Sequence, residues 1–205
     1  MKKLLIVFLI ALVFFIVIMV CIFNSVDFLC MIAEGSNEPS SLHNFTIERI
    51  YKIAEKKDIG EKLVKNIKEN KKNNLHTLYI RILGVIGEEG TLPCLMEIYI
   101  KHQEETKSIK VYNVIKSLGL LGKEEVVPFL ERILNREDRW IVLNHPIAES
   151  LYLLTGNQYK FINPQGEMQK LHLYDELLRA REVILNTKMR KRNFKDMVIL
   201  DKLFR

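Results

Sequence analysis

Cysteine is scarce in this sequence, and the positions of its three copies exclude one class of fold. Cys21 and Cys30 lie in or next to an apolar N-terminus, which leaves Cys94 alone in the rest of the chain. A small disulfide-stabilised domain needs paired cysteines, so this chain must derive its stability from a hydrophobic core instead. We expect Cys94 to be a buried apolar residue of that core.

The common motifs of catalysis and cofactor binding are also missing. The five histidines have no metal-ligand spacing with one another or with a cysteine pair. The sequence contains no glycine-rich phosphate loop, no nucleophile elbow and no zinc-protease motif. We therefore expect no catalytic residue, no cofactor and no metal in this protein.

The excess of one sign of charge is small. The formal net charge is +6, and 31 basic residues stand against 25 acidic ones. Without Lys2 and Lys3, 29 basic residues remain, and their excess over the 25 acidic residues falls to four. A nucleic-acid-binding domain has a much stronger basic footprint, so the sequence predicts no nucleic-acid partner.

A long apolar run is present at the N-terminus, where Leu4–Phe23 carries no charge. Twenty helical residues extend about 30 Å, which matches the apolar core of a bilayer. A cleaved signal peptide usually has a shorter apolar region and small residues before its cleavage site. We therefore predict an uncleaved transmembrane signal anchor over residues 1–23, with membrane contact through residues 4–23. Lys2 and Lys3 favour a single-pass protein of the cell membrane, with a cytoplasmic N-terminus and an extracytoplasmic C-terminal domain.

Two alternatives for this segment stay open. Ile18–Cys21 resembles a lipobox, which would make Cys21 the lipidated residue of a lipoprotein, although Val20 stands where a small residue is expected. A cleaved signal peptide would instead give a secreted protein. Residues 24–44 include the polar, turn-rich stretch Glu34–Ser41 and are predicted to form a linker.

The central part of the chain contains a sequence motif that is repeated once. The segment Leu83–Pro93 returns as Leu118–Pro128, with an offset of 35 residues between matching leucines, glycines and prolines. A fixed period of this length indicates a repeat architecture. Gly84 and Gly119 fall inside predicted helices, where glycine is unfavourable, so they indicate close approach of a paired helix.

Each copy has a helix that ends in Leu-Gly-x-x-Gly, then a short acidic loop, then a helix that opens with Leu-Pro or Val-Pro. Over Leu75–Arg136 this pattern resembles the HEAT-like repeat of the PBS-lyase type found in proteins of the bacterial envelope. The resemblance implies a short α-solenoid built from antiparallel helix pairs. It carries over no catalytic residue, because the matched positions are structural.

Helical periodicity extends the repeat region on both sides. Phe45–Lys68 is predicted to be a helix pair, and Asp58 lies three residues before Glu61 in the pattern of a capping box for the second helix. A third, truncated unit ends at Gly156. We therefore predict an all-α fold whose solenoid covers residues 45–156.

A non-repeat cap is predicted over residues 157–205. Asn163-Pro-Gln-Gly166 has the chemistry of a β-turn, so residues 158–170 are predicted to form either a small hairpin or an ordered loop. A last helix is expected from Tyr174 to Arg192, followed by apolar residues that dock back onto the domain.

The interruptions of the repeat pattern provide the candidate sites. Solenoids expose extended surfaces to other proteins, so we predict a membrane-tethered scaffold that binds a protein partner through its helical surface, without catalysis. On the resemblance, the alternative is an enzyme or cofactor-attachment factor similar to the phycobilin lyases. The candidate partner-binding residues are Trp140, Asn144 and His145 beside the last repeat, and Lys188, Arg190, Lys191 and Arg192 near the end of the last helix.

Overall fold

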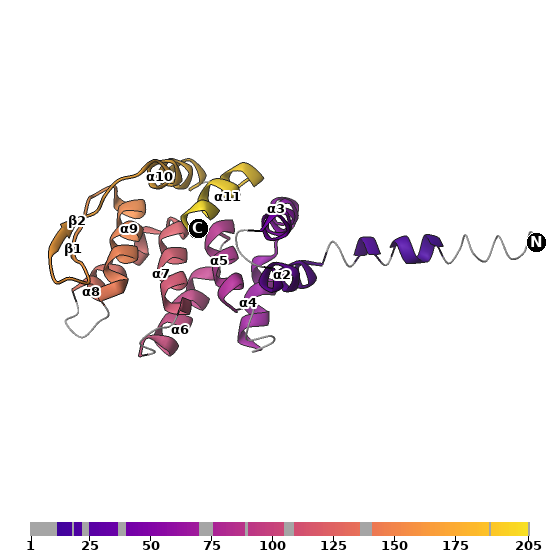
Figure 1. Cartoon of the computed structure of the whole chain (residues 1–205), viewed down its shortest axis with the longest axis horizontal. Helices are drawn as coiled ribbons and strands as arrows, with labels where there is room; N and C mark the ends of the chain where they lie inside the picture. The colour runs from indigo at the N-terminus through magenta and orange to yellow at the C-terminus, as the bar shows by residue number, and fades with distance from the viewer. Residues whose placement is uncertain are drawn as a thin grey trace, which may run out of the picture. The chain divides into compact units, whose positions relative to one another are not determined.

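The computed structural model describes residues 12–17, 19–21, 25–36, 40–69, 76–88, 90–104, 109–135, 141–188 and 190–204. Helices dominate these residues, which confirms the predicted all-α class (Figure 1). The chain divides into two compact units, Met1–Ile53 and Ala54–Arg205. The division falls inside one helix, so the second unit contains the last turn of that helix and everything that follows.

The first unit contains two helices within the described residues that follow the apolar N-terminus. Helix α2 spans Val26–Gly35, and helix α3 spans Ser41–Lys56. Residues 24–44, predicted to be a linker, therefore contain a complete helix. The reason is an apolar stripe in α2, where Val26, Leu29, Cys30 and Ala33 repeat at helical spacing and are buried.

Among the described residues, no single helix is both long enough and apolar enough to cross a bilayer. The segment Leu12–Cys21 and helix α2 meet that requirement only when they are taken together as a bent pair. The predicted anchor over residues 1–23 lies partly outside the described residues.

The second unit is built around three helices that lie side by side. These are α5 (His76–Ile86), α7 (Ile109–Leu121) and α9 (Asn144–Thr155), and we call them the central row. Helix α6 (Thr91–His102) packs on α7, and α8 (Val127–Leu134) packs on α9. Helix α4 (Gly60–Lys68) packs on α5 and α6. The short turns η2 (Glu124–Val126) and η3 (Ile141–Leu143) lead into α8 and α9.

Some repeat marks in the sequence have the local roles predicted for them, whereas Gly84 and Gly119 lie against Ser117 and Ser150 of the next central helix and not against their paired helices. Gly87 and Gly122 follow α5 and α7 with φ values of 65° and 71°, a left-handed conformation that glycine adopts without a steric penalty. Pro128 lies in the first turn of α8, where its missing N–H costs no hydrogen bond. Cys94 is buried as expected, and burial raises the pKa of its thiol to about 11.

A small hairpin follows the central row, as one of the two alternatives for residues 158–170 predicted. Strand β1 (Lys160–Ile162) pairs antiparallel with β2 (Met168–Lys170), and Phe161 lies opposite Gln169. The N–H of Gly166 donates to the carbonyl oxygen of Asn163 at 2.9 Å and closes the turn. Strand β1 packs on α9, which supports a hairpin that would be marginal alone.

The chain ends in two helices where the sequence predicted one. Helix α10 spans Asp175–Thr187, α11 spans Phe194–Asp201, and the short turn η4 covers Lys202–Phe204. Asn193 starts α11 through a capping box with Asp196, in which each side chain accepts from the other residue's backbone N–H. Helix α10 packs on α9, and α11 packs on α5. Figure 1 shows both helices on the side of the central row that faces away from α6 and α8.

Candidate functional site

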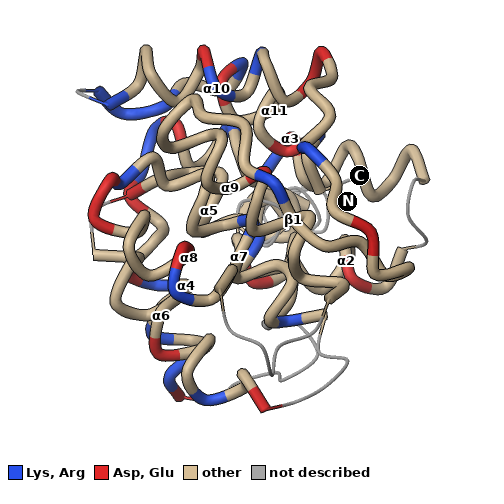
Figure 2. Tube along the Cα trace, turned by 90° about the vertical axis from the view of Figure 1, so that its left-hand side faces the viewer, with Lys and Arg blue, Asp and Glu red and all other residues tan. Residues whose placement is uncertain are grey.

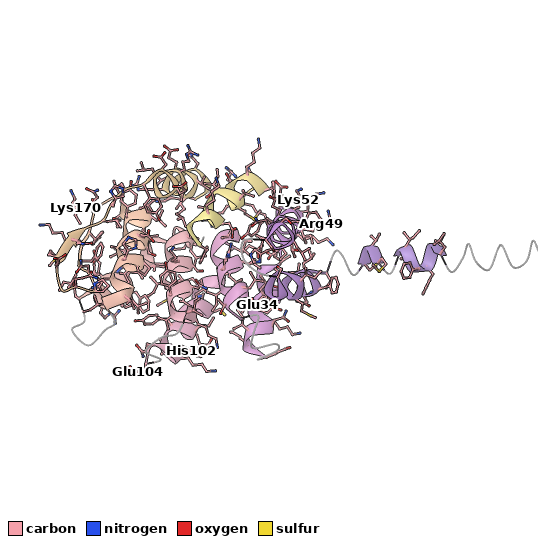
Figure 3. All side chains as sticks on the ribbon, viewed as in Figure 1. Glu34, Arg49, Lys52, His102, Glu104 and Lys170 are labelled. Atoms are coloured by element: carbon pink, nitrogen blue, oxygen red, sulfur yellow. The ribbon has the colours of Figure 1, made fainter. Side chains whose placement is uncertain are left out.

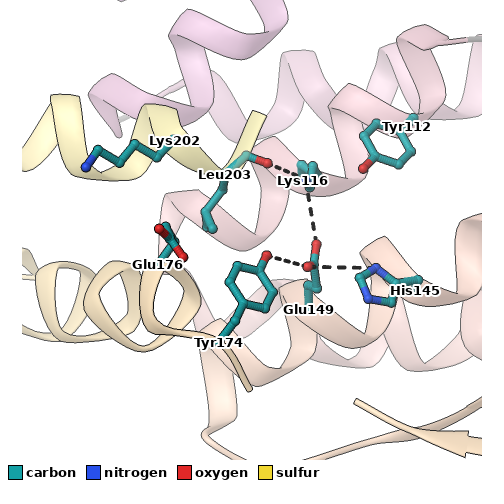
Figure 4. Close-up of a pocket in the computed structure, with 8 residues that line it drawn as sticks. All are labelled: Tyr112, Lys116, His145, Glu149, Tyr174, Glu176, Lys202 and Leu203. Carbon is teal, nitrogen blue, oxygen red and sulfur yellow. Dashed lines mark hydrogen bonds and ion pairs between the residues drawn. The ribbon is translucent and has the colours of Figure 1, made fainter. Parts of the chain in front are cut away.

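An open hollow of about 670 Å³ lies where the central row meets the C-terminal segment (Figure 4). Helices α7 and α9 form one side of it, and the start of α10 and the turn η4 form the other. Its lining residues are Tyr112 and Lys116 from α7, His145 and Glu149 from α9, Tyr174 and Glu176 at the start of α10, and Lys202 and Leu203 from η4.

Glu149 is at the centre of a hydrogen-bonded and ionic cluster in this hollow (Figure 4). Its carboxylate is almost fully buried, and Tyr174 donates its hydroxyl proton to Oε1 at 2.6 Å. The Nζ of Lys116 lies 3.7 Å from Oε2, and Nδ1 of His145 lies 3.7 Å from Oε1. Both carboxylate oxygens therefore have partners, as a buried charge requires.

Helix geometry brings these groups together. His145 and Glu149 are four residues apart in α9, so they lie on the same face one turn apart. Lys116 comes from the adjacent helix α7 and also donates to the carbonyl oxygen of Leu203 in η4. Its ammonium lies 5.2 Å from the ring centre of Tyr112, within the range of a cation–π interaction.

Tyr174 immediately precedes α10 and acts as a hydrogen-bond donor to Glu149. Burial raises the pKa of its hydroxyl, and the hydrogen bond to the carboxylate of Glu149 raises it further. The phenol therefore stays protonated at neutral pH. It acts as a fixed donor rather than as an acid that releases its proton.

The hollow offers charges of both signs beside the rings of Tyr112, Tyr174 and His145. Glu149 is buried and paired with groups of the protein itself. The side chain of His145 is half exposed, and Lys202 and Glu176 are exposed at the rim. Such a surface can receive a polar group together with an apolar side chain. No group of three His, Cys, Asp or Glu residues in the described part of the chain is arranged to hold a metal ion.

One of the residues predicted beside the last repeat, His145, belongs to this hollow. His145 lines it, and its ring packs edge-on against Phe161 with centroids 5.5 Å apart. Asn144 is buried, and its side-chain N–H donates to the carbonyl oxygen of Ile162 at 2.6 Å, which ties α9 to the hairpin. Trp140 lies outside the described residues. Cys21, the candidate lipidation site, is exposed at the end of Leu12–Cys21.

Arg192, one of the four predicted basic residues, is buried at the ends of two repeat helices. Its guanidinium donates to the carbonyl oxygens of Gly84 and Val85 at 2.9 Å each, and to that of Leu120. These carbonyl groups belong to the last turns of α5 and α7, which have no partner within their own helix. Burial lowers the pKa of Arg192 to about 10, so it remains a cation at neutral pH.

The other three basic residues are at the surface and also contact the chain itself. Lys188 lies 2.6 Å from a carboxylate oxygen of Glu124, and Arg190 lies 2.7 Å from one of Asp196. Lys191 donates to the carbonyl oxygen of Lys57 at 3.0 Å. Basic and acidic residues are interspersed along the trace here and elsewhere (Figure 2).

Sequence reasoning missed three residues of the cluster, namely Lys116, Glu149 and Tyr174. A signal for two of them is present, because Lys116 and Glu149 are charged residues in the middle of helices whose other central residues are buried and mostly apolar. Comparisons with protein-family models, curated proteins and solved structures find no match to this chain. The function is therefore inferred from the geometry of the site.

Proposed function

We propose that this chain is a HEAT-like repeat scaffold that binds another protein and is tethered to the cell membrane through residues 4–23. In this proposal the N-terminus is cytoplasmic and the C-terminal domain is extracytoplasmic, as the charges that flank the apolar run favour. The resemblance of Leu75–Arg136 to the PBS-lyase type of repeat supports the solenoid. The side-by-side packing of α5, α7 and α9, each with its partner helix, supports it too.

A contact that recurs between successive helices of the central row supports the repeat further. Ser117 packs against Gly84, and Ser150 packs against Gly119 in the same way one unit later. Each serine hydroxyl also donates, at 2.9 Å, to the carbonyl oxygen four residues before the glycine that it touches. The same interaction thus joins α5 to α7 and α7 to α9, which is the regularity that a solenoid has.

The hollow around Glu149 is the observation that carries the binding proposal. Helices α10 and α11 pack on the central row. The hollow lies beside the start of α10 and the turn η4, and there the row is open to a partner. Tyr112, Tyr174 and His145 present aromatic rings there, and tyrosine is enriched among the residues that dominate binding energy in protein interfaces. A segment of the partner would place an apolar side chain between these rings and a polar group near Lys202.

Site-specific crosslinking in native membranes tests this proposal. A photo-reactive amino acid replaces His145 in the full chain, and a matched variant carries it at the exposed Lys101 at the end of α6. We expect one discrete crosslinked partner from position 145, absent at position 101 and reduced by Lys202→Ala. Equal products at both positions, or none at 145, would reject the hollow as the binding site. Release of the protein by alkaline carbonate would reject the tether separately.

An enzyme or cofactor-attachment factor is the second candidate, because the hollow contains residue types that acid–base catalysis uses. His145 and Glu149 interact there, and Glu176 is at the rim. Native mass spectrometry of the purified full chain separates the two candidates. A covalent or tightly bound small molecule that disappears in His145→Ala would favour this second function, and a bare chain mass would favour the scaffold.

A further inference from the structure

Helix α3 exposes a stripe of two apolar and two basic side chains. Leu42, Phe45, Arg49 and Lys52 are spaced by three, four and three residues, so they form a single stripe along the helix. All four are exposed, and the apolar Leu42 and Phe45 expose 52% and 63% of their surface. Arg49 and Lys52 project from α3 in Figure 3.

The opposite face of α3 is buried. Ile47, Ile50 and Tyr51 are buried there, and Nδ1 of His43 lies 2.9 Å from the carbonyl oxygen of Ala33 in α2. Helices α2 and α3 are therefore held together. The stripe is the remaining surface on which α3 exposes large apolar side chains in the described part of this unit.

Chain length limits how far this pair of helices can lie from the apolar N-terminus. Leu12–Cys21 exposes apolar side chains along most of its described length, and α2 begins at Val26. The five residue steps from Cys21 to Val26 reach at most about 17 Å when the chain is fully extended. If residues 4–23 span the membrane, α2 and α3 must lie at the surface of the bilayer where that span ends.

We propose that the stripe Leu42–Phe45–Arg49–Lys52 of α3 binds the phospholipid surface. Leu42 and Phe45 enter the boundary between headgroups and acyl chains, while Arg49 and Lys52 pair with lipid phosphates. Amphipathic helices with basic residues beside apolar ones bind the interface in this way, and basic side chains near an anionic surface strengthen the contact. The proposal rests on the membrane tether proposed above, and it adds a second, separable membrane contact to it.

Quenching of tryptophan fluorescence by brominated lipid tests the stripe in the full chain. Trp140, the single native tryptophan, is replaced by phenylalanine, and one new tryptophan is introduced as Phe45→Trp or as Glu48→Trp. Glu48 is also exposed on α3 but lies at the flank of the stripe, so it serves as the matched control. Each variant is reconstituted into vesicles of phosphatidylcholine and phosphatidylglycerol that contain dibrominated phosphatidylcholine.

We expect at least twofold stronger quenching of Phe45→Trp than of Glu48→Trp, and a loss of that difference when Arg49 and Lys52 are both changed to Gln. Vesicle flotation of the same samples reports the tether independently. Flotation with equal or no quenching at the two positions would overturn the stripe and leave the tether intact. Failure to float would overturn both.

Discussion

Ser117 lies so close to Gly84 that a β-carbon on the glycine would come within 2.6 Å of the Cα and the side chain of the serine. Helices α5 and α7 therefore approach each other more closely than any larger residue allows. The same relationship between Gly119 and Ser150 sets the spacing of α7 and α9. Two glycines that are unfavourable within their own helices thus determine the packing of the whole central row.

Substitution of Gly84 by alanine should destabilise the protein. Alanine improves helix propensity by about 1 kcal/mol, but overpacking against backbone atoms costs about 1–3 kcal/mol and requires the helices to separate. We expect the midpoint of thermal unfolding in detergent to fall by about 2–4 °C for each kcal/mol lost. Gly35→Ala is the control, since its β-carbon would have no neighbour within 4 Å. Equal midpoints for the two variants would contradict the close approach.

Substitution of Arg192 by lysine should also destabilise the protein although the charge is kept. A lysine ammonium cannot reach the carbonyl groups of both α5 and α7, and each buried polar group left unpaired costs about 1–3 kcal/mol. We expect a loss of about 2 kcal/mol in the free energy of unfolding. The exposed neighbour Lys191 provides the control, because Lys191→Gln should change the free energy of unfolding by no more than about 0.5 kcal/mol. Unchanged stability of Arg192→Lys together with weaker partner capture would instead place Arg192 in a binding surface.

Arg81 and Asp201 form a buried, bidentate ion pair between α5 and α11. The Nε–Oδ1 distance is 2.8 Å and the Nη2–Oδ2 distance is 2.9 Å. Asp201→Asn leaves the guanidinium buried without its counter-charge, which typically costs about 3–5 kcal/mol. Hydrogen exchange should show that the amides of α11 lose protection first. The exposed pair of Lys68 and Glu97 is the control, and Glu97→Gln should have almost no effect.

A double variant checks the origin of that cost. Arg81→Met combined with Asp201→Leu removes both charges and keeps apolar volume, so it should be more stable than Asp201→Asn alone. A double variant that is as unstable as the sum of its single changes would show that the two side chains do not interact.

Stability should depend on pH through Glu88. Burial and a hydrogen bond with Asp58 raise the pKa of its carboxyl from 4.5 to about 7. The folded state therefore favours the protonated form, and this contribution is complete below about pH 4.5 and is lost as the pH rises through 7. The pKa of Asp58 is lowered by its hydrogen bond with Glu88, so the contribution of Asp58 is lost only at more acidic pH.

We expect the midpoint of thermal unfolding to fall between about pH 4.5 and pH 7. Glu88 is partly exposed, so solvent screening reduces the effect to about 1 kcal/mol. Glu88→Gln keeps a side-chain amide in place and cannot titrate, so its midpoint should be flat over this range. A wild-type midpoint that is equally flat would show that Glu88 titrates near its usual pKa in the folded protein.

Local chemistry allowed the sequence to predict the helix ends of the repeats. Gly87 and Gly122 were predictable because a left-handed backbone demands glycine at one position, regardless of what surrounds it. The capping box expected from Asp58 and Glu61 shows the limit of such reasoning. The N–H groups of Ile59 and Gly60 donate to Glu88, which is distant in sequence and lies in the loop after α5.

The hollow was not predictable because it too depends on residues that are distant in sequence. Lys116 and Glu149 belong to helices that the repeat pattern places side by side, but Tyr174 and Leu203 complete the site from the C-terminal segment. No periodicity connects that segment to the repeats. Its break into α10 and α11 depends on the capping box of Asn193 and Asp196, a pattern that is visible in the sequence only once a helix start is expected there.

The position of Arg192 also affects the order in which contacts can form while the protein is being synthesised. The guanidinium completes the ends of α5 and α7, yet it is translated 108 residues after Gly84 and 72 residues after Leu120. These carbonyl groups therefore leave the ribosome without their side-chain partner, and they gain it only when Arg192 has been synthesised. A chain cut short before Arg192 would contain α5 and α7, which the contact of Gly84 with Ser117 brings together, and would still lack the side chain that bonds to the carbonyl groups at the ends of both helices.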